Sequence, residues 1–336
     1  MVTIYDIAKK ANCSAMTVSR VINDTGRISD KTRQRVKAIM EEMNYVPNAM
    51  ARSLVLHETK LLSLLITDIT NPFYTTLARG AEDAAKRLGY RVMFSNSDEN
   101  LLKEKEYIDT VLSARVDGVI IAPTGDHSLP HLEKLRSHKI PFVLVDREVP
   151  GIESDCVLGD SKEGSRKLVE HLLQLGHTRI ALLNGSSEVS TARIREQGYR
   201  ETLKLHGIEP EEQYICELGY ARSDADQAIT SLLQLEQRPT AIFAANNFIA
   251  LAAIRALRAK GLEVPRDMSI VCFDDMEMDY VVDPFLTVAA QPAYEFGAMS
   301  VQLLIERIQG TSYDWRSIVL PSKLILRHSC TAPPQS

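Results

Sequence analysis

The chain has 336 residues, 45% of them hydrophobic and 25% charged, which is usual for a folded globular protein and exceeds what one core fills, so we expect several domains. Its apolar runs, such as residues 61–66 and 119–122, are too short to cross a bilayer, and Asp6, Lys9 and Lys10 interrupt any apolar leader. Five scattered cysteines favour neither disulfides nor a zinc site, so we expect a reducing cytoplasm, no metal and no cofactor.

Charge is divided unevenly along the chain. Residues 1–60 contain ten Lys or Arg against six Asp or Glu, a net charge of +4, and the remainder carries −9. A basic head on an acidic body suits a polyanion-binding module that does not draw the whole protein onto nucleic acid. Composition alone leaves open a solvated, charged helix face.

The first 45 residues predict a helix-turn-helix followed by a third helix. Apolar residues recur at helical spacing after Thr3 and again after Ser14, and either side chain can cap its helix. Two short helices so closely joined cross steeply, and Asn12 in the turn tolerates the left-handed conformation needed there. A third helix from a Ser29 cap to about Asn44 closes the small core.

The second helix leaves polar and small side chains facing away from its apolar side. These are Ala15, Met16, Thr17, Ser19 and Arg20. Such a set can enter a major groove, where hydroxyls and arginine reach phosphates or base edges and small groups meet thymine methyls. The alternative is a three-helix bundle without a nucleic-acid role.

The segment after Pro47 predicts a helix that cannot stand alone. Pro47 ends the third helix, and Asn48 can cap a new one through Leu54. Seven residues fall below the roughly 12–15 that an isolated helix needs in water. We therefore expect this segment to fold only when something packs against it.

The stretches TIYDIAKKANCSAMTVSRVIN and KTRQRVKAIMEEMNYVPNAMARSL resemble the LacI/GalR family of bacterial transcription repressors. The resemblance implies a headpiece over residues 1–46 and a hinge helix with linker over 47–60, and it implies homodimers on a near-palindromic operator. The DNA-contacting positions it implies are Thr3, Tyr5, Ser14, Ala15, Met16, Thr17, Ser19, Arg20 and Asn23 in the head and Asn48, Ala51, Arg52 and Leu54 in the hinge. In the family, the residue matching Leu54 wedges into the minor groove and kinks the duplex.

From Leu61 the pattern becomes alternating strands and helices. Near-continuous apolar strands between amphipathic helices indicate parallel sheets covered on both faces. Two such series predict an α/β body of two doubly wound lobes with several crossovers, which resembles periplasmic sugar-binding proteins. We place one lobe at about 61–159 plus 292–321 and the other at about 160–291 plus 322–331, within a domain over 61–336. A hinge between lobes creates a cleft that can close on a ligand.

Ligands bind beyond the carboxyl ends of parallel strands, so the polar residues there are candidates. For Asp160 we favour a helix-capping role. The effector candidates, several of which the family resemblance implies, are Phe73, Asp146, Thr191, Arg195, Tyr220, Asn247 and Asp274. The chain departs from the family at Asn247, often aspartate, and at Val189, an arginine in a purine-binding relative. These departures disfavour a nucleobase recognised in that relative's manner.

No catalytic motif is recognisable: the chain has no glycine-rich phosphate loop, G-x-S-x-G or H-E-x-x-H. His127, His131 and His177 read as loop or surface residues. We therefore expect no enzyme but a DNA-binding regulator, a repressor whose operator affinity is controlled by a sugar-like small molecule. A small-molecule binding protein without a DNA role is the alternative, and it explains only the body.

Overall fold

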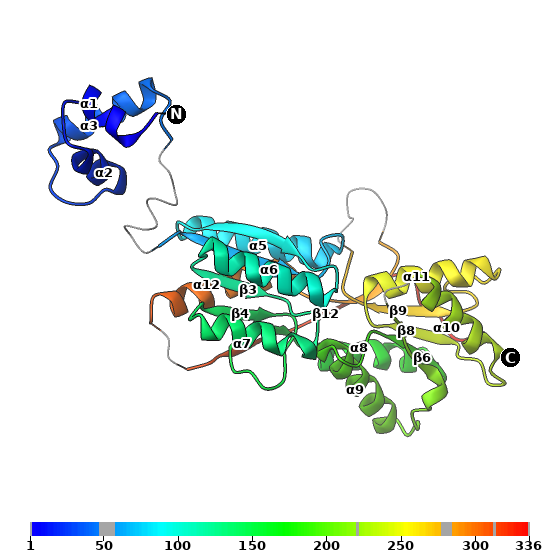
Figure 1. Ribbon diagram of the computed structural model, residues 1–336. Helices are drawn as coiled ribbons and strands as arrows, with labels where there is room; N and C mark the ends of the chain where they lie inside the picture. Colours follow the sequence, from blue (N-terminus) through cyan, green and yellow to red (C-terminus); the bar gives the residue numbers. More distant parts are fainter. Residues whose placement is uncertain (1, 47–57, 220–221, 277–283, 312–313, 335–336) are drawn as a thin grey trace. The chain divides into compact units, whose positions relative to one another are not determined.

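The computed structural model describes residues 2–46, 58–219, 222–276, 284–311 and 314–334, and the chain divides into compact units of residues 1–60 and 61–336 (Figure 1). Five candidate site residues lie outside the described ranges: Asn48, Ala51, Arg52, Leu54 and Tyr220. The short hinge helix and the contacts of Tyr220 therefore stay predictions, as do the proposed domain boundaries. None of the helices within the described residues combines the length and apolar character that a bilayer span needs.

The first unit contains three helices, α1 (Ile4–Lys10), α2 (Ala15–Asn23) and α3 (Asp30–Glu42). Each begins at its predicted cap: Thr3, Ser14 and Ser29 accept hydrogen bonds from the backbone N–H three residues later. Asn12 is left-handed at φ 48°, as predicted for the turn. The predicted helix-turn-helix is confirmed, although α3 ends at Glu42 rather than near residue 44.

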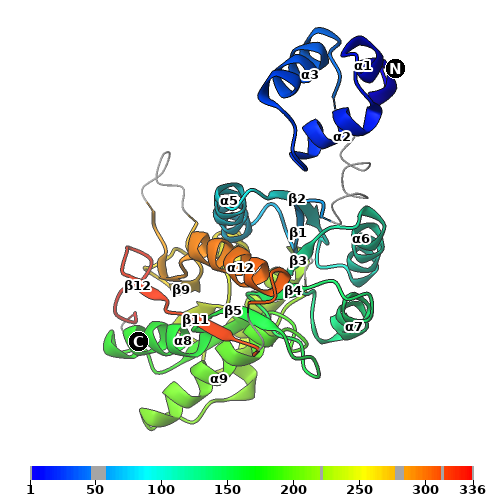
Figure 2. The same ribbon diagram turned by 90° about the vertical axis from the view of Figure 1, so that its left-hand side faces the viewer.

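The first sheet of the second unit has six parallel strands in the order β11-β5-β4-β3-β1-β2 (Figure 2). The strands are β1 (Leu61–Ile66), β2 (Arg91–Asn96), β3 (Gly118–Ile121), β4 (Phe142–Val145), β5 (Asp155–Gly159) and β11 (Ser317–Leu320). Side chains alternate between the faces of each strand. One face packs on α5 (Pro72–Arg87) and α12 (Ala293–Ile308), and the other on α6 (Leu101–Ala114) and α7 (Leu129–Ser137).

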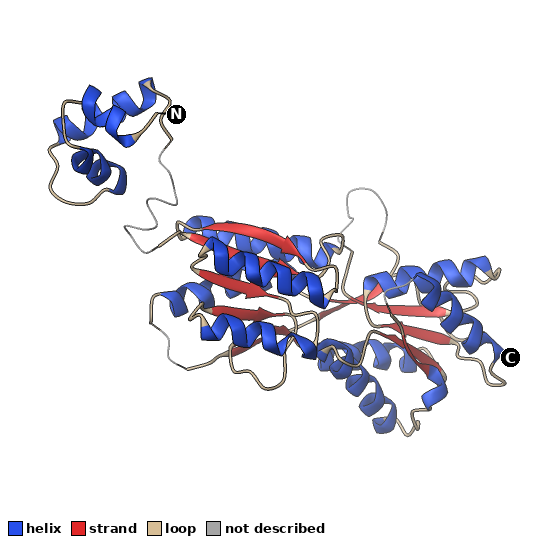
Figure 3. Ribbon diagram, viewed as in Figure 1, coloured by secondary structure: helices blue, strands red, loops and turns tan. Residues whose placement is uncertain are grey.

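The second sheet repeats this plan in the order β12-β10-β9-β8-β6-β7, with β12 antiparallel to β10. Figure 3 shows helices flanking the strands of both sheets. The strands of the second sheet are β6 (Ile180–Asn184), β7 (Ile215–Glu217), β8 (Ala241–Ala244), β9 (Ser269–Phe273), β10 (Thr287–Ala290) and β12 (Lys323–Ile325). Its helices are α8 (Ser161–Gln174) and α9 (Ser190–Leu205) on one face and α10 (Arg222–Gln234) and α11 (Asn247–Ala259) on the other. The predicted fold class is confirmed.

Three crossings connect the sheets: β5 leads into α8, β10 into α12, and β11 into β12. The second crossing returns the chain to the first sheet, and the third brings it back to the second sheet. Two glycines let α5 and α12 pack backbone to backbone, since a Cβ at Gly80 would lie 2.0 Å from the Tyr294 carbonyl oxygen and one at Gly297 would lie 1.9 Å from that of Leu77. Only glycine tolerates so close an approach.

The structure corrects two predictions made outside the site. His131, expected in a loop or at the surface, lies on the helix α7 (Leu129–Ser137) and is half-buried, with Nδ1 2.6 Å from the Glu104 carboxylate. His177 is buried rather than exposed, with its ring nitrogens hydrogen-bonded to Thr240, Ser269 and the Thr331 carbonyl. Because both ring nitrogens of His177 have hydrogen-bond partners, the side chain has a structural role.

Candidate functional site

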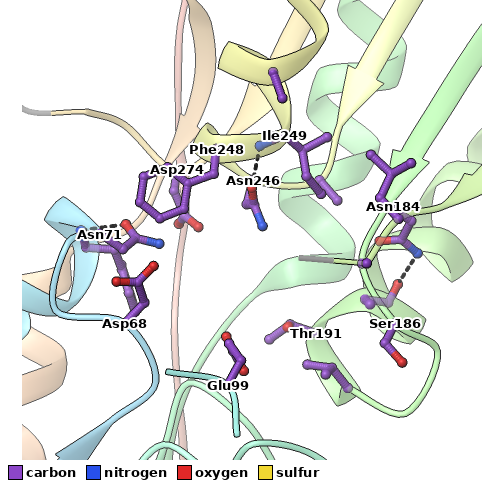
Figure 4. A pocket seen from close by; sticks show the side chains of 18 of the residues that line it. Asp68, Asn71, Glu99, Asn184, Ser186, Thr191, Asn246, Phe248, Ile249 and Asp274 are labelled. Atoms are coloured by element: carbon purple, nitrogen blue, oxygen red, sulfur yellow. Dashed lines mark hydrogen bonds between the residues drawn. The ribbon is translucent and has the colours of Figure 1, made fainter. Parts of the chain in front are cut away.

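A cavity of about 520 Å³ opens where the carboxyl ends of the two sheets face each other (Figure 4). The first sheet and its loops contribute Asp68, Asn71, Phe73, Tyr74, Asp98, Glu99, Asp146 and Arg147 to its wall. The second contributes Asn184, Thr191, Arg195, Leu218, Asn246, Phe248, Ile249 and Asp274, among others. Carboxyl ends of parallel strands are where such folds bind ligands, and the volume suits a small organic molecule.

Arg195 and Asp274 form the most buried charged pair of the cavity. Arg195 projects from α9, with its guanidinium carbon 3.9 Å from the centre of the Phe273 ring and Nη1 donating to the Ala245 carbonyl at 2.7 Å. Its Nη2 lies 3.8 Å from Oδ2 of Asp274, while Oδ1 of Asp274 accepts from Gln291 at 2.7 Å. Because 3.8 Å exceeds hydrogen-bond length, Nη2 and Oδ2 stay available to a ligand that both donates and accepts.

Asp146 occupies the equivalent place in the other sheet. Asp146 follows β4 and Asp274 follows β9, the strands at matching positions, and both have φ 67°. Oδ2 of Asp146 accepts from the Tyr74 hydroxyl at 2.9 Å. The two carboxylates thus approach the cavity from opposite lobes, and each repels charge on the other, since Asp146 contributes to raising the pKa of Asp274.

Burial raises the pKa of Asp274 to about 6, against the opposing effect of the Arg195 charge. The folded state therefore holds this proton more tightly than the unfolded state, so the stability it contributes is complete below about pH 4 and is lost as pH rises through about 6. Between pH 4 and pH 7, we expect the free energy of unfolding of the wild type to fall by up to about 3 kcal/mol more than that of Asp274→Asn. Urea unfolding across this range measures the difference, and a pH-independent difference would contradict it.

The structure brings five of the seven predicted effector residues to the cavity wall: Phe73, Asp146, Thr191, Arg195 and Asp274. Asn247 lies elsewhere: its side chain is fully buried, and its amide donates to Oδ1 of Asn71 at 3.0 Å. Asn247 therefore joins the two lobes directly behind the wall, where Asn71 itself faces the cavity. Asp160 caps α8 through the Glu163 N–H at 3.1 Å, as predicted.

Sequence reasoning missed two components of the wall. The Glu99 carboxylate accepts two hydrogen bonds, of 2.6 and 2.7 Å, from the Arg147 guanidinium. The two residues are 48 positions apart in the chain. An apolar wall is built mainly from α11, with Phe248 and Leu251 among its members. Their spacing of three residues on a helix predicted as amphipathic was the available signal.

The two lobes also touch at one rim of the cavity. Asp126, in the short 3-10 turn η1 (Asp126–Ser128) of the first lobe, binds Arg193 through hydrogen bonds of 2.9 and 3.1 Å. Its backbone N–H donates to the Glu188 carbonyl at 3.0 Å, and His127 lies 3.0 Å from the Glu188 carboxylate. These contacts hold the lobes together at this edge without involving the cavity.

The head presents most of its predicted DNA-contacting side chains to solvent. Thr3, Tyr5, Ser14, Met16 and Arg20 are exposed, with Tyr5 at 73% and Met16 at 65%. Thr17 and Ser19 are half-buried, and Thr17 shares a hydrogen bond with the Ser14 cap. Ala15 packs partly on the head core, and Asn23 is buried with its amide on the Ser19 hydroxyl at 3.3 Å, so the DNA contacts expected of these two residues stay predictions.

The two units match family descriptions separately. Residues 3–48 match "Bacterial regulatory proteins, lacI family", and residues 59–328 match "Periplasmic binding proteins and sugar binding domain of LacI family". Among curated relatives, the chain is 39% identical over 334 residues to the HTH-type transcriptional regulator DegA of Bacillus subtilis (strain 168), covering 98% of both chains. It is 34% identical over 329 residues to catabolite control protein A of Priestia megaterium, covering 98% of this chain and 99% of that one.

Solved structures are similar over nearly the whole chain. The lac repressor dimer bound to operator and the anti-inducer ONPF matches with a TM-score of 0.84 and 31% identity, covering 98% of this chain and 99% of that chain. The complex of the transcriptional regulator CelR with cellobiose matches with a TM-score of 0.73 and 29% identity, covering 98% and 100%.

Proposed function

This chain belongs to the LacI family of bacterial regulatory proteins and is a DNA-binding transcriptional regulator, and we propose that it acts as a homodimeric repressor controlled by a sugar or sugar derivative. The observation that carries the effector is the Arg195–Asp274 pair. It offers a donor and an acceptor 3.8 Å apart on the cavity wall. Adjacent hydroxyls of a sugar can accept from one and donate to the other.

Strand β1 supplies a physical route from the cavity to the head. Residues 47–60 lead directly into Leu61, where β1 begins, and the loop at its other end carries Asp68 and Asn71 into the cavity wall. A six-residue strand spans about 20 Å. An effector that changes the arrangement of the lobes thereby moves the attachment of the segment that precedes β1, and coupling of this kind works in both directions.

The alternative, a sugar-binding protein without a DNA role, accounts for the second unit only. It gives no role to the solvent-exposed face of α2, and it does not explain why residues 3–48 match a family of bacterial regulatory proteins. A role on chromosomal DNA places the protein in the cytoplasm. All five cysteines are free thiols, which suits that compartment.

Operator recognition can be tested by selecting duplexes from a randomised pool with the purified full chain. We expect a near-palindromic site, because two-fold symmetric dimers read two half-sites. Arg20→Ala should then weaken binding to the selected site by about 1–3 kcal/mol, the worth of a base contact. Titration on selected and scrambled duplexes measures the effect.

Arg258→Ala, at an exposed arginine of α11, is the control and should leave both affinities unchanged. Equal affinity of Arg20→Ala and wild type for the selected duplex would remove α2 from base recognition. Failure to enrich any duplex would contradict the proposal that this protein is a repressor.

A further inference from the structure

The dipeptide Asp274-Asp275, which follows β9, has a strained backbone that several contacts hold in place. Asp274 lines the cavity (Figure 4) and has φ 67°, in the left-handed region that side chains other than glycine rarely adopt. Its backbone N–H donates to the Ala289 carbonyl of β10 at 3.0 Å. Such a conformation persists only where the surrounding structure determines it. The partners of the two carboxylates therefore help to fix this turn.

The side chain of Gln291 joins the dipeptide to two of the three crossings. Gln291 directly follows β10, in the second crossing, and its Nε2 donates to Oδ1 of Asp274 at 2.7 Å. Its Oε1 lies against the first crossing, since a Cβ at Gly159, the last residue of β5, would be 1.7 Å from that oxygen. One buried amide thus lies between Asp274 and the end of a strand in the other lobe.

Arg327 joins the dipeptide to the third crossing. Arg327 lies two residues beyond β12, the strand in which that crossing ends. Its two terminal nitrogens donate to the two carboxylate oxygens of Asp275, both at 2.7 Å. The side chains are only 14% and 15% exposed, and a bidentate pair of this kind fixes geometry as well as adding energy. The third crossing is therefore fastened to the residue next to Asp274.

Neither Gln291 nor Arg327 belongs to the described wall of the cavity, whereas Asp274 does. A ligand in the cavity therefore acts on these two side chains only through the dipeptide. The crossings are the covalent connections between the two sheets, so their paths and the arrangement of the lobes depend on each other. A shift of Asp274 reaches both returning crossings through two short, buried contacts.

Resting on the proposed effector function, we propose that Gln291 and Arg327 are positioning residues that transfer effector contact at Asp274 to the second and third crossings. Gln291 acts on Asp274 directly, and Arg327 acts through Asp275. An effector that holds Asp274 differently in two arrangements of the lobes thereby favours one of them. A variant that breaks either contact binds the effector but no longer passes its effect to the operator.

Operator affinity of the full chain, measured with and without a sugar, tests both residues. The probe is whichever of ribose, glucose, galactose and cellobiose binds the wild type most tightly in calorimetry, used at saturation for each variant. Effectors change a coupled affinity about 5–150-fold, and Gln291→Met and Arg327→Met should bring this ratio close to one while still binding the sugar. A wild-type ratio, or loss of sugar binding, in either variant would overturn the role of that residue.

Gly159→Ala is a second variant that does not alter the glutamine itself. The added methyl group occupies the place of Oε1 of Gln291, so this variant should reproduce the ratio of Gln291→Met. Gln302→Met, at an exposed glutamine of α12, is the matched control for the glutamine. Arg266→Met, at an exposed arginine paired with Asp267, is the matched control for the arginine. Both controls should keep the wild-type ratio.

The proton that Asp274 takes up is a probe that needs no sugar. Burial raises the pKa of Asp274 to about 6, and the charged groups that act on it are Arg195, Asp146 and Asp275. Between pH 5 and pH 8, wild-type operator affinity should change at least about fivefold more than that of Asp274→Asn, and Gln291→Met should lack this extra change.

The two probes separate this proposal from the sugar effector. If no sugar changes wild-type operator affinity, the sugar effector of the proposed function falls, and the pH comparison decides the transfer by itself. Equal pH responses of wild type and Asp274→Asn, or a wild-type response in Gln291→Met, would then overturn it.

Discussion

Arg195→Ala is expected to lower effector affinity roughly ten- to a hundredfold. Arg195 is 6% exposed and its Nη2 lies 3.8 Å from the buried Asp274 carboxylate, so its loss removes a ligand donor and a charge that offsets Asp274. A hydrogen bond to a charged group contributes roughly 1.5–3 kcal/mol, and 1.4 kcal/mol corresponds to about tenfold in affinity. Calorimetry with a sugar that stabilises the wild type measures the loss.

The control for this variant is Arg200→Ala on the same helix. Arg200 pairs with Glu196 and Glu212 at the surface, so its removal should leave effector affinity unchanged. Operator affinity without effector should persist in both variants, since the head is a separate compact unit. Unchanged effector affinity in Arg195→Ala would remove this arginine from the binding site.

Ile7→Ala is expected to abolish operator binding while sparing effector binding. Ile7 is fully buried in the core shared by α1, α2 and α3. Truncating such a residue costs about 2–5 kcal/mol, and a unit of this size buries too little surface to have much more stability than that. The second unit has four hydrophobic clusters of its own and should fold as before.

Two thermal transitions followed by circular dichroism separate the units in this experiment. Ile7→Val loses one methylene, which costs about 0.5–1.5 kcal/mol, and should keep operator binding at low temperature. Operator affinity equal to wild type in Ile7→Ala would show that the head core tolerates a cavity and that the stability argument is wrong.

Local signals explain why the head and the strand pattern could be predicted from the sequence. The side chains of Thr3, Ser14 and Ser29 each accept a hydrogen bond from the backbone N–H three residues later. The left-handed conformation of Asn12 is a property of that one residue, so neighbouring sequence is enough to predict it. Buried strands reveal themselves by short apolar runs. The helix at 129–137 was missed because Pro130 and its polar neighbours read as a loop, although proline is well tolerated in the first turn of a helix.

Contacts between distant segments explain the rest. His177 read as a surface residue because its partners Ser269 and Thr331 lie 92 and 154 residues further along the chain. Asn247 was placed in the cavity by its position after a strand, but Asn71, 176 residues away, takes up its amide. A polar residue shows in the sequence only that it needs a partner, and the tertiary fold decides which partner it finds.

The rim contacts between η1 and α9 add little to the free energy that joins the lobes. Asp126 and Arg193 are each about one-third exposed, and ion pairs in such surroundings contribute roughly 0–1 kcal/mol. The buried hydrogen bond between Asn71 and Asn247 is a second junction between the same lobes. A ligand redistributes two arrangements of the lobes only by as much as its affinities for them differ, so the rim ion pair takes little from the preference that an effector must supply.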